Sequence, residues 1–384
     1  MGTSDNTSRK FKNKEKPSNF KILKMLSLII PTYNERENII SLIQELLAIF
    51  QQNSIPAEII IVDDNSPDGT ATEVQTILGK HPNIRLVVRN GKEGLSSAVL
   101  AGFALSQETI VGVMDADGSH SSQDVVHLYQ AITSPSTGSS PDFVIGSRYI
   151  TSGNIEGWPW VRKLISKGAT LLARPFTSVK DPLSGFFMIK KQCIEKIDFD
   201  SKGFKICLEF IVKAHWKQII EVPITFTNRK RGKSKANFWE GVYYLRNLCK
   251  YVFYKWPACL EYFRFITVGA MGIVINILIL YALTEYVGMY YLYSSILAFL
   301  GAVTHNFFLN RSWTFFKSKK QEKGVLILYF KFLVLAVTVL GINLFLLSHF
   351  VEHYGWWYIA GQFISISIAS GVNFIGSKYW VFKS

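Results

Sequence analysis

The sequence contains few cysteines. Only four occur among 384 residues, at Cys193, Cys207, Cys249 and Cys259, and their spacing is neither paired nor ligand-like. This argues against a zinc site and against a disulfide framework. We expect four reduced cysteines with structural roles.

The first 24 residues lack the apolar run that forms the core of a signal peptide. They contain seven Lys or Arg residues and few apolar ones. We therefore expect residues 1–25 to form a disordered basic tail in the cytoplasm.

Acidic residues are also scarce: 28 Asp and Glu stand against 42 Lys and Arg, which gives a formal net charge of +14. The basic residues concentrate in the tail, in one loop and beside hydrophobic segments. That distribution indicates an anionic membrane surface or a phosphate ligand, and no nucleic-acid partner is expected. Charged and turn-forming residues continue to about residue 245, and long aliphatic and aromatic runs dominate the remainder.

The first part of the chain alternates short β-rich runs with helical patterns. The expected strands cover residues 26–30, 58–62, 84–89, 110–114 and 143–145, and the expected helices include residues 37–50 and Leu95–Leu105. Near-continuous apolar strands separated by helices predict an α/β domain with a mostly parallel sheet covered on both faces. In such sheets ligands bind at the carboxyl ends of the strands.

Acidic side chains follow three of these strands, where their mutual repulsion requires a cation or hydrogen-bond donors nearby. Asp68 can be a ligand or simply part of a turn and helix cap, because Pro67-Asp68-Gly69 is ordinary turn chemistry. Asp115 and Asp117 directly follow a buried strand, and two carboxylates so spaced can share a hard divalent cation such as Mg²⁺ or Mn²⁺. Such a cation would neutralise a leaving diphosphate.

Several motifs together resemble glycosyltransferase family 2, and more narrowly its dolichyl- or polyprenyl-phosphate mannosyltransferase branch. The resemblance covers nearly all of residues 26–240. The motifs that carry it are Pro-Thr-Tyr-Asn-Glu-Arg-Glu-Asn (31–38), Val-Asp-Asp-Asn-Ser-Pro-Asp-Gly-Thr (62–70), Lys-Glu-Gly-Leu-Ser-Ser-Ala (92–98), Asp-Ala-Asp (115–117), Gly-Ser-Arg-Tyr (146–149), Trp-Pro-Trp-Val-Arg-Lys-Leu-Ile-Ser (158–166), Asp-Pro-Leu-Ser-Gly-Phe-Phe (181–187) and Arg-Lys-Arg-Gly-Lys-Ser-Lys (229–235).

The resemblance implies a Rossmann-like GT-A glycosyltransferase domain over residues 26–237 and a set of donor-binding residues. It implies donor contacts from Pro31, Tyr33, Glu35, Val62, Asp64, Asp115, Ala116 and Asp117, with the metal held by Asp115, Asp117 and Ser119. The chain departs from the family where Ser121 and Ser122 replace a proline, which makes Ser119 the less secure ligand. His120 can act as a base or pack beside the site.

A lipid phosphate acceptor is already ionised near neutral pH, so it needs cations to hold it rather than a general base. The resemblance implies that the acceptor phosphate is bound by Arg148, Arg162, Lys205, Arg229 and Lys235. Within the basic loop, Lys230 and Lys233 are better interpreted as solvated charges. Asp181 either forms a turn before a strand or shapes the site; we place it with Asp115, Asp117 and Arg148 among the catalytic residues.

Residues 238–260 interleave aromatic and basic side chains, a composition typical of the membrane headgroup zone. We predict a juxtamembrane amphipathic segment, with an ordinary core helix as the alternative. Four apolar stretches follow, at residues 265–284, 287–310, 325–350 and 354–377. Each is long enough to cross a bilayer, which takes roughly 20 helical residues. Residues 261–384 are therefore expected to form an all-α domain of four transmembrane helices.

The charges flanking these helices predict a multi-pass protein whose catalytic domain and both termini are cytoplasmic. Basic residues occupy the middle connection and the end of the chain, whereas the other two connections carry mainly Glu285 and Glu352. The basic positions are Arg311, Lys317, Lys319, Lys320, Lys323, Lys378 and Lys383.

The membrane segment contains a tandem repeat with an offset of 67 residues. Tyr262-Phe263-Arg264-Phe265 matches Tyr329-Phe330-Lys331-Phe332, and Trp313-x-Phe315 matches Trp380-x-Phe382. Because one period contains two helices, the two copies share one orientation. The segment resembles the GtrA-type membrane domain.

These expectations combine into one function: inverting transfer of a hexose to a polyprenyl or dolichyl phosphate. The resemblance implies mannose from GDP-mannose, with the lipid bilayer as the other partner. Three alternatives stay open: a polyprenyl-phosphate glucosyltransferase using UDP-glucose, a processive polysaccharide synthase, and a non-catalytic transport or scaffold protein. The processive class typically carries a Gln-x-x-Arg-Trp motif that this chain lacks.

Overall fold

The computed structural model describes residues 25–134, 139–199, 205–228, 238–316 and 324–382. The chain divides into two compact units, Met1–Tyr251 and Val252–Ser384. The division falls inside helix α7 (Phe238–Lys255), within the segment where the sequence predicts an amphipathic juxtamembrane element.

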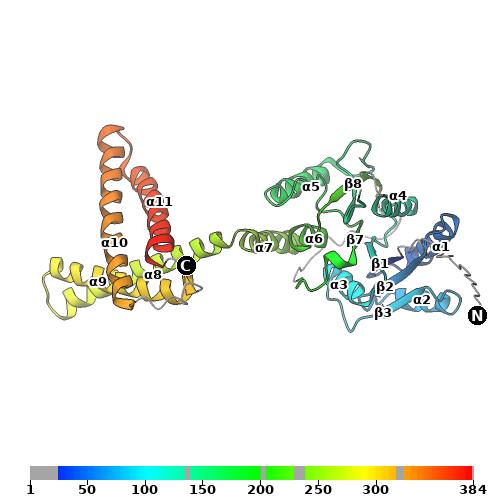
Figure 1. Ribbon diagram of the computed structural model, residues 1–384, viewed down its shortest axis with the longest axis horizontal. Helices are drawn as coiled ribbons and strands as arrows, with labels where there is room; N and C mark the ends of the chain where they lie inside the picture. The colour runs from blue at the N-terminus through cyan, green and yellow to red at the C-terminus, as the bar shows by residue number, and fades with distance from the viewer. Residues whose placement is uncertain (1–24, 135–138, 200–204, 229–237, 317–323, 383–384) are drawn as a thin grey trace, which may run out of the picture. The chain divides into compact units, whose positions relative to one another are not determined.

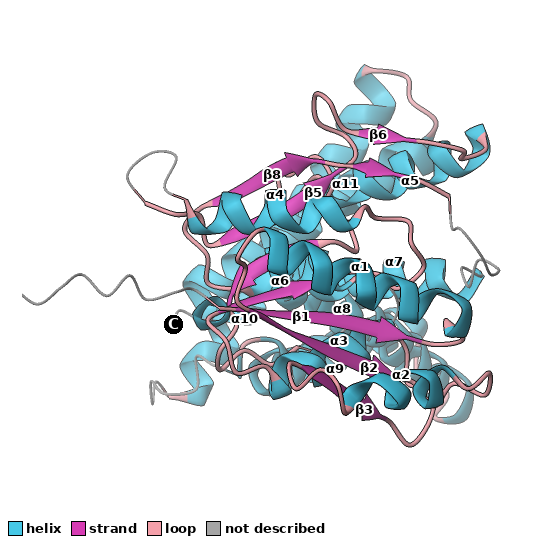
Figure 2. Cartoon of the chain, turned by 90° about the vertical axis from the view of Figure 1, so that its right-hand side faces the viewer, coloured by secondary structure: helices cyan, strands magenta, loops and turns pink. Residues whose placement is uncertain are grey.

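The first unit is organised around a seven-stranded sheet of order β3-β2-β1-β4-β7-β5-β8. Strands β1, β2 and β3 run in the same direction (Figure 2), β4 pairs parallel with β1, and only β7 is antiparallel to its two neighbours, β4 and β5. The mostly parallel α/β sheet predicted from the sequence is confirmed. The strands are β1 (Leu26–Thr32), β2 (Ala57–Asp63), β3 (Ile84–Val88), β4 (Ile110–Val113), β5 (Phe143–Ser147), β7 (Phe187–Lys190) and β8 (Ile219–Pro223).

The central strands are apolar on both sides because helices cover both faces of the sheet. Every residue of β1 is buried, and its side chains alternate between two cores. Leu28 and Ile30 pack with residues of α1, α2 and α4, whereas Ile29 packs with residues of α3 and α6. The helices of this unit (Figure 1) are α1 (Arg36–Gln52), α2 (Thr70–Leu78), α3 (Leu95–Leu105), α4 (Ser122–Thr133), α5 (Trp160–Ala173) and α6 (Ile206–Lys213).

A second, two-stranded sheet pairs β6 (Asn154–Ile155) with β9 (Thr225–Phe226). Beyond β9, the backbone N–H of Thr227 donates to the carbonyl oxygen of Ser119 at 3.0 Å. This bond fastens the end of β9 to the loop that follows β4.

The strand directions bring the predicted site residues to one edge of the sheet. The carboxyl ends of β1, β2, β4 and β5 share that edge, because these strands are mutually parallel or both antiparallel to β7. Since β7 runs the opposite way, its amino end lies at the same edge. The segment before β7, which contains Asp181 and Gly185, therefore lies beside the residues that follow β4 and β5.

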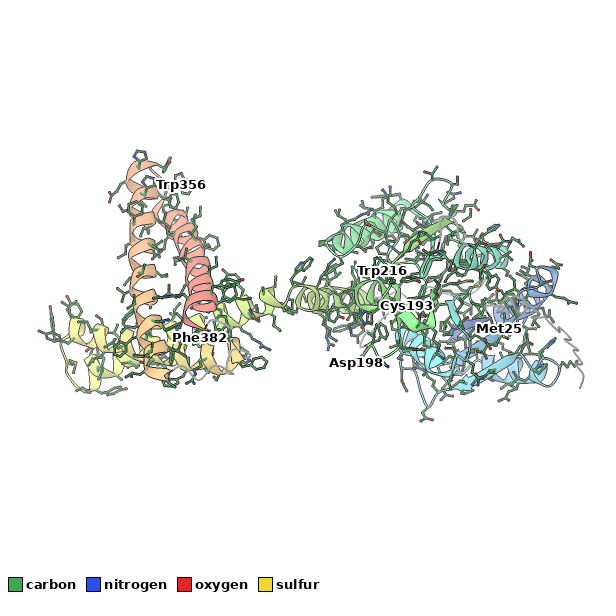
Figure 3. The ribbon with its side chains drawn as sticks, viewed as in Figure 1. Met25, Cys193, Asp198, Trp216, Trp356 and Phe382 are labelled. Atoms are coloured by element: carbon green, nitrogen blue, oxygen red, sulfur yellow. The ribbon has the colours of Figure 1, made fainter. Side chains whose placement is uncertain are left out.

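The second unit contains four helices that are long and apolar enough to cross a membrane: Pro257–Tyr286, Tyr291–Thr314, Val325–His353 and Tyr358–Val381. Each consists of an α-helix, namely α8 (Pro257–Tyr281), α9 (Tyr291–Leu309), α10 (Val325–Ser348) or α11 (Tyr358–Gly376), followed by a wider π-helical turn. α10 and α11 form a hairpin with Trp356 at its tip and Phe382 at its opposite end (Figure 3).

The second and fourth of these helices each begin four residues later than the apolar pattern suggests. Gly288 and Gly355 precede them with φ of +71° and +67°, a left-handed conformation that glycine adopts without a steric cost. These two glycines are themselves 67 residues apart, so the turn belongs to the repeat.

The sequence repeat is visible as a paired aromatic cluster. Phe265 packs on Phe374 with ring centroids 5.6 Å apart, and the positions 67 residues away, Phe332 and Phe307, repeat the contact at 5.8 Å. Phe315 and Phe382 are themselves repeat mates, and they stack on each other at 5.2 Å. The two hairpins therefore interlock through equivalent residues, as expected for a pseudo-twofold arrangement.

Candidate functional site

Asp115 and Asp117 begin the loop directly after β4. Gly118 follows with φ of +70°, and the backbone N–H of Ser119 donates to Asp117 Oδ1 at 3.0 Å. This turn buries Asp117 and leaves the Asp115 side chain 29% exposed. Asp115 also lies against Gly185, where an added Cβ would be only 2.6 Å from Asp115 Oδ2.

Two side chains in the same loop are buried without partners. Within the part of the chain that the structure describes, Ser119 Oγ and both ring nitrogens of His120 make no hydrogen bond. His120 Nε2 lies 3.6 Å from Asp115 Oδ2. Its ring packs against Phe186 and Phe226, with centroids 5.0 and 5.1 Å away. The His120 ring therefore packs against two aromatic side chains next to Asp115, and its role as a base is not tested by this geometry.

Asp115, Asp117 and Ser119 are suited to bind a divalent cation whose coordination is completed by a bound ligand. In the described ranges, no group of three or more His, Cys, Asp or Glu could hold a metal ion by itself. Two neighbouring carboxylates with an unpartnered hydroxyl beside them are oxygen donors of the kind Mg²⁺ and Mn²⁺ take. The remaining coordination would come from diphosphate oxygens and water.

Arg148, at the end of β5, forms a buried two-pronged ion pair with Asp181. Its Nε and Nη2 donate to the two carboxylate oxygens at 2.7 and 2.8 Å, and its backbone N–H donates to Asp181 Oδ2 at 3.0 Å. Burial lowers the pKa of the guanidinium, but the Asp181 carboxylate more than offsets this and raises it above its ordinary value. Nη1 makes no hydrogen bond to a described residue, so one prong remains available for a ligand.

Further cations surround this pair. Lys205 immediately precedes α6, and burial followed by repulsion from Arg148 lowers the pKa of its ammonium, against the opposing pull of Asp181 and Asp115. Arg162, on α5, lies with its guanidinium 4.0 Å from the ring centre of Trp158. The Arg148 guanidinium is 5.5 Å from the same ring. Three of the predicted acceptor residues therefore lie in one group: Arg148 repels Lys205, and Arg148 and Arg162 both approach the ring of Trp158.

The other two predicted acceptor residues, Arg229 and Lys235, lie outside the described residues. The segment that contains them is bounded by anchored neighbours. On one side, Thr227 bonds to Ser119 and Asn228 Nδ2 donates to the carbonyl of Gly157. On the other side, α7 begins at Phe238.

The predicted donor residues lie at the carboxyl ends of β1 and β2 and in the loops that follow: Pro31 and Val62 are the second-last residues of their strands, and Tyr33, Glu35 and Asp64 come after the strands end. The two loops are joined by hydrogen bonds: the N–H of Asn34 donates to Ser66 Oγ at 2.9 Å, and the N–H of Glu35 donates to Thr70 Oγ1 at 3.0 Å. Lys92 places its ammonium 4.2 Å from the ring centre of Tyr33. Tyr33 and Glu35 make further interactions within the protein.

Hydrogen-bond donors offset the acidic groups of these loops. Asp64 is buried and forms an ion pair with Arg89, and the N–H of Gly94 donates to its second oxygen at 2.8 Å. Asp68 Oδ1 accepts from the N–H and the hydroxyl of Thr70 at 3.0 and 2.6 Å. Asp68 therefore serves as a turn and cap residue at the start of α2.

Arg89 is the residue that the sequence interpretation missed. It directly follows β3, and its side chain is 8% exposed. An arginine at the carboxyl end of a predicted strand, residues 84–89, is the sequence signal that could have identified it. Gly185 and Phe226 were also not predicted from the sequence to be site residues. Their contacts with Asp115 and His120 depend on strand order rather than on any local pattern.

Helix α5, beside this group of cations, exposes a row of large apolar side chains together with basic ones. Tyr244 of α7 holds the helix by donating its hydroxyl to the carbonyl of Ala169 at 2.6 Å. The exposed apolar residues are Trp160, Val161, Leu164, Ile165, Leu171 and Leu172, and the basic residues of the helix are Arg162, Lys163 and Lys167.

Residues 27–198 match Glycosyl transferase family 2, and residues 264–382 match the family GtrA/DPMS, transmembrane domain. The chain is 34% identical over 359 residues to a dolichol-phosphate mannosyltransferase of Pyrococcus furiosus, covering 92% of this chain and 98% of that relative. The chain belongs to glycosyltransferase family 2, in its dolichol-phosphate mannosyltransferase branch.

Two further members of this branch are similar over more than half of this chain. One is a dolichol-phosphate mannosyltransferase of Saccharomyces cerevisiae, 36% identical over 242 residues, which are 60% of this chain and 88% of that one. The other is a polyprenol monophosphomannose synthase of Mycolicibacterium smegmatis, 35% identical over 234 residues, which cover 58% of this chain and 85% of that one. As a family 2 member with a GtrA/DPMS domain, the chain is a membrane-bound glycosyltransferase with a Rossmann-like GT-A catalytic fold.

Proposed function

We propose that this enzyme transfers mannose from GDP-mannose to a dolichyl or polyprenyl phosphate, with inversion at the sugar carbon. The observation that carries the proposal is the group of cations at the edge of the sheet. Arg148 and Lys205 are electrostatically coupled to Asp115, so positive charge adjoins the first aspartate of the Asp-Ala-Asp motif. The choice of mannose and of a dolichyl or polyprenyl phosphate rests on the similarity to dolichol-phosphate mannosyltransferases and to a polyprenol monophosphomannose synthase.

The acceptor chemistry explains why cations are needed there. A phosphate oxygen is already a nucleophile near neutral pH, so the protein's task is to hold it in line with the sugar carbon and to offset its charge. Asp181 fixes the plane of the Arg148 guanidinium through two hydrogen bonds, which leaves Nη1 to reach the acceptor. Arg162, Lys205, Arg229 and Lys235 supply the remaining positive charge.

Asp115 and Asp117 would hold the divalent cation, Mg²⁺ or Mn²⁺, with Ser119 as a further oxygen donor. When bound, the cation stabilises the charge that develops on the leaving diphosphate. The two aspartates would fix its position. The rest of the donor would be bound by Ala116 and by the carboxyl ends of β1 and β2 with the loops that follow them, through Pro31, Tyr33, Glu35, Val62 and Asp64.

The lipid acceptor would reach the site from the bilayer. Helix α5 exposes Trp160, Leu164 and Ile165 next to Arg162 and Lys163, a combination of aromatic, apolar and basic side chains suited to a membrane surface. The proposal puts the catalytic unit and both termini in the cytoplasm, and it is supported by the basic residues of the middle connection and the acidic residues of the other two.

The test is a transfer assay with purified full-length enzyme and a short polyprenyl phosphate. We expect sugar to be transferred from GDP-mannose, little or none from UDP-glucose, and none to the corresponding polyprenol without phosphate. Addition of a chelator should stop the reaction, and Mn²⁺ or Mg²⁺ in excess should restore it. Preferential use of UDP-glucose would refute the donor, and full activity in chelator would refute the metal.

A further inference from the structure

His120 occupies an unusual environment for a polar side chain. Its side chain is 1% exposed, two aromatic rings pack against it, and neither ring nitrogen has a hydrogen-bond partner among the described residues. An imidazole that is buried without any hydrogen bond costs free energy, so a partner is expected in the working enzyme. The Asp115 carboxylate is close to this ring, with Oδ2 3.6 Å from Nε2.

Asp115 Oδ2 is confined from the other side as well. Gly185 lies so close that any larger residue there would place its Cβ 2.6 Å from this oxygen. Phe186, the next residue, packs against the His120 ring with the two ring planes tilted by 38°. Gly185 and Phe186, directly before β7, therefore restrict the space available to Asp115 Oδ2 and to the His120 imidazole.

The third boundary is β9. Phe226 packs edge-on against the His120 ring, and Thr227 bonds to the carbonyl of Ser119, the residue before His120. With its ring held on two faces and its backbone fastened, His120 has little freedom to turn away from Asp115. A shift of a few tenths of an ångström would bring Nε2 and Oδ2 within hydrogen-bond range.

We propose that His120 is a positioning residue for the donor-bound state: its Nε2–H donates to Asp115 Oδ2 and turns the carboxylate toward the diphosphate and its cation. The role requires a proton on Nε2, the ring nitrogen that faces Asp115. This inference rests on the proposed function, because it requires Asp115 to be a ligand of the cation that binds the donor.

The test separates the hydrogen bond from the packing. His120→Phe keeps an aromatic ring between Phe186 and Phe226 but removes the donor, whereas His120→Gln keeps a donor that can reach the position of Nε2. The matched control is His127→Gln, which changes a half-exposed histidine on α4. Calorimetry measures GDP binding to each full-length variant in chelator and in Mn²⁺, and thermal unfolding monitors the fold.

For the wild type we expect Mn²⁺ to strengthen GDP binding markedly. In His120→Phe the gain in GDP affinity from Mn²⁺ should be about tenfold smaller than in the wild type, as expected for the loss of a hydrogen bond to a charged group. The GDP affinity of this variant in chelator should equal that of the wild type. His120→Gln should recover most of the gain, and His127→Gln should match the wild type. A folded Phe variant that keeps the full gain, or a Gln variant that loses as much as Phe, would overturn the positioning role.

Two further outcomes are informative. If His120→Phe is not recovered folded, His120→Asn replaces it, because its shorter amide cannot reach Asp115, and the same difference from Gln is expected. If the wild type itself shows no Mn²⁺-dependent gain with GDP, the proposed donor and metal are wrong, and the role of His120 fails with them.

Discussion

Arg148 and Asp181 are 33 residues apart in the chain, yet their charged groups meet in a buried, two-pronged pair. Asp181 is fully buried and accepts three hydrogen bonds from Arg148. Its backbone N–H is held in turn by Glu221 at 3.0 Å. A carboxylate with this many partners is fixed in place, and so is the guanidinium that it holds.

Removing one charge of this pair should affect both stability and acceptor use. For Asp181→Asn we expect the free energy of unfolding to fall by about 3–5 kcal/mol, because the Arg148 charge is left buried without a partner. Thermal and denaturant unfolding of the full-length protein measure the loss, and kcat/KM toward polyprenyl phosphate should fall with it.

The control for this prediction is Glu73→Gln, which removes the partner of Arg36 in a surface pair. Such pairs contribute about 0–1 kcal/mol, so stability and activity should change little. An Asp181→Asn variant as stable and as active as Glu73→Gln would show that the buried pair has neither role.

At the level of elements, the segment at residues 229–237 connects two fixed points. Thr227 is bonded to the loop after β4. α7 is fastened to α5 by the Tyr244 hydroxyl and to the segment after α5 by the ring contact of Tyr251 with Phe176, 6.0 Å between centroids. Arg229 is only two residues from Thr227. We propose that Arg229 acts on the acceptor phosphate, and the following variant tests this.

Arg229→Ala should weaken the acceptor far more than the donor. Removing one partner of a desolvated charge pair typically costs roughly 2–5 kcal/mol, so kcat/KM toward polyprenyl phosphate should fall about 30-fold or more. GDP affinity measured by calorimetry should change only slightly. Arg229→Lys should recover part of the loss, because an ammonium restores the charge without the planar fork.

Lys230→Ala is the matched control for this segment, since we interpret Lys230 as a solvated charge, and its kinetics should resemble the wild type. Loss of nucleotide affinity in step with activity in Arg229→Ala would place the basic segment over the donor diphosphate instead of the acceptor.

The whole molecule combines a catalytic unit with a membrane unit built from two similar hairpins. The hairpins interlock through equivalent aromatic residues, but the polar contacts between them differ. Lys378 of α11's terminal turn pairs with Glu261 of α8 at 2.6 Å, whereas at the other junction the Thr304 hydroxyl meets Tyr329 at 2.8 Å. The repeat therefore conserves the apolar core and varies the polar contacts that join its copies.

Charge asymmetry makes a prediction about orientation. In a Cys249→Ser, Cys259→Ser background, which removes the two exposed cysteines, Ser318→Cys should react with an impermeant thiol reagent only from the cytoplasmic side. Glu352→Cys should react only from the opposite side and serves as the control. The reverse pattern would invert the proposed topology.

The sequence alone predicted the elements whose signals are local. Strands at Leu26, Ile84, Ile110 and Phe143 begin where the apolar runs begin, and helix Leu95–Leu105 has the predicted bounds. Strand β8 was not predicted, because it is only partly buried, contains Glu221 and ends in Pro223, as suits its position at the edge of the sheet.

The sequence also determined the motif order, the family resemblance and the 67-residue repeat, because each depends only on residues that lie near one another in the chain or recur at a fixed offset. Tertiary structure decided which side chains meet. The pairing of Asp64 with Arg89 requires β2 beside β3, and the contacts of Asp115 with Gly185 and of Arg148 with Asp181 require β7 between β4 and β5. Because β7 runs antiparallel there, the segment before it reaches the edge where its neighbours end, and no local pattern encodes that placement.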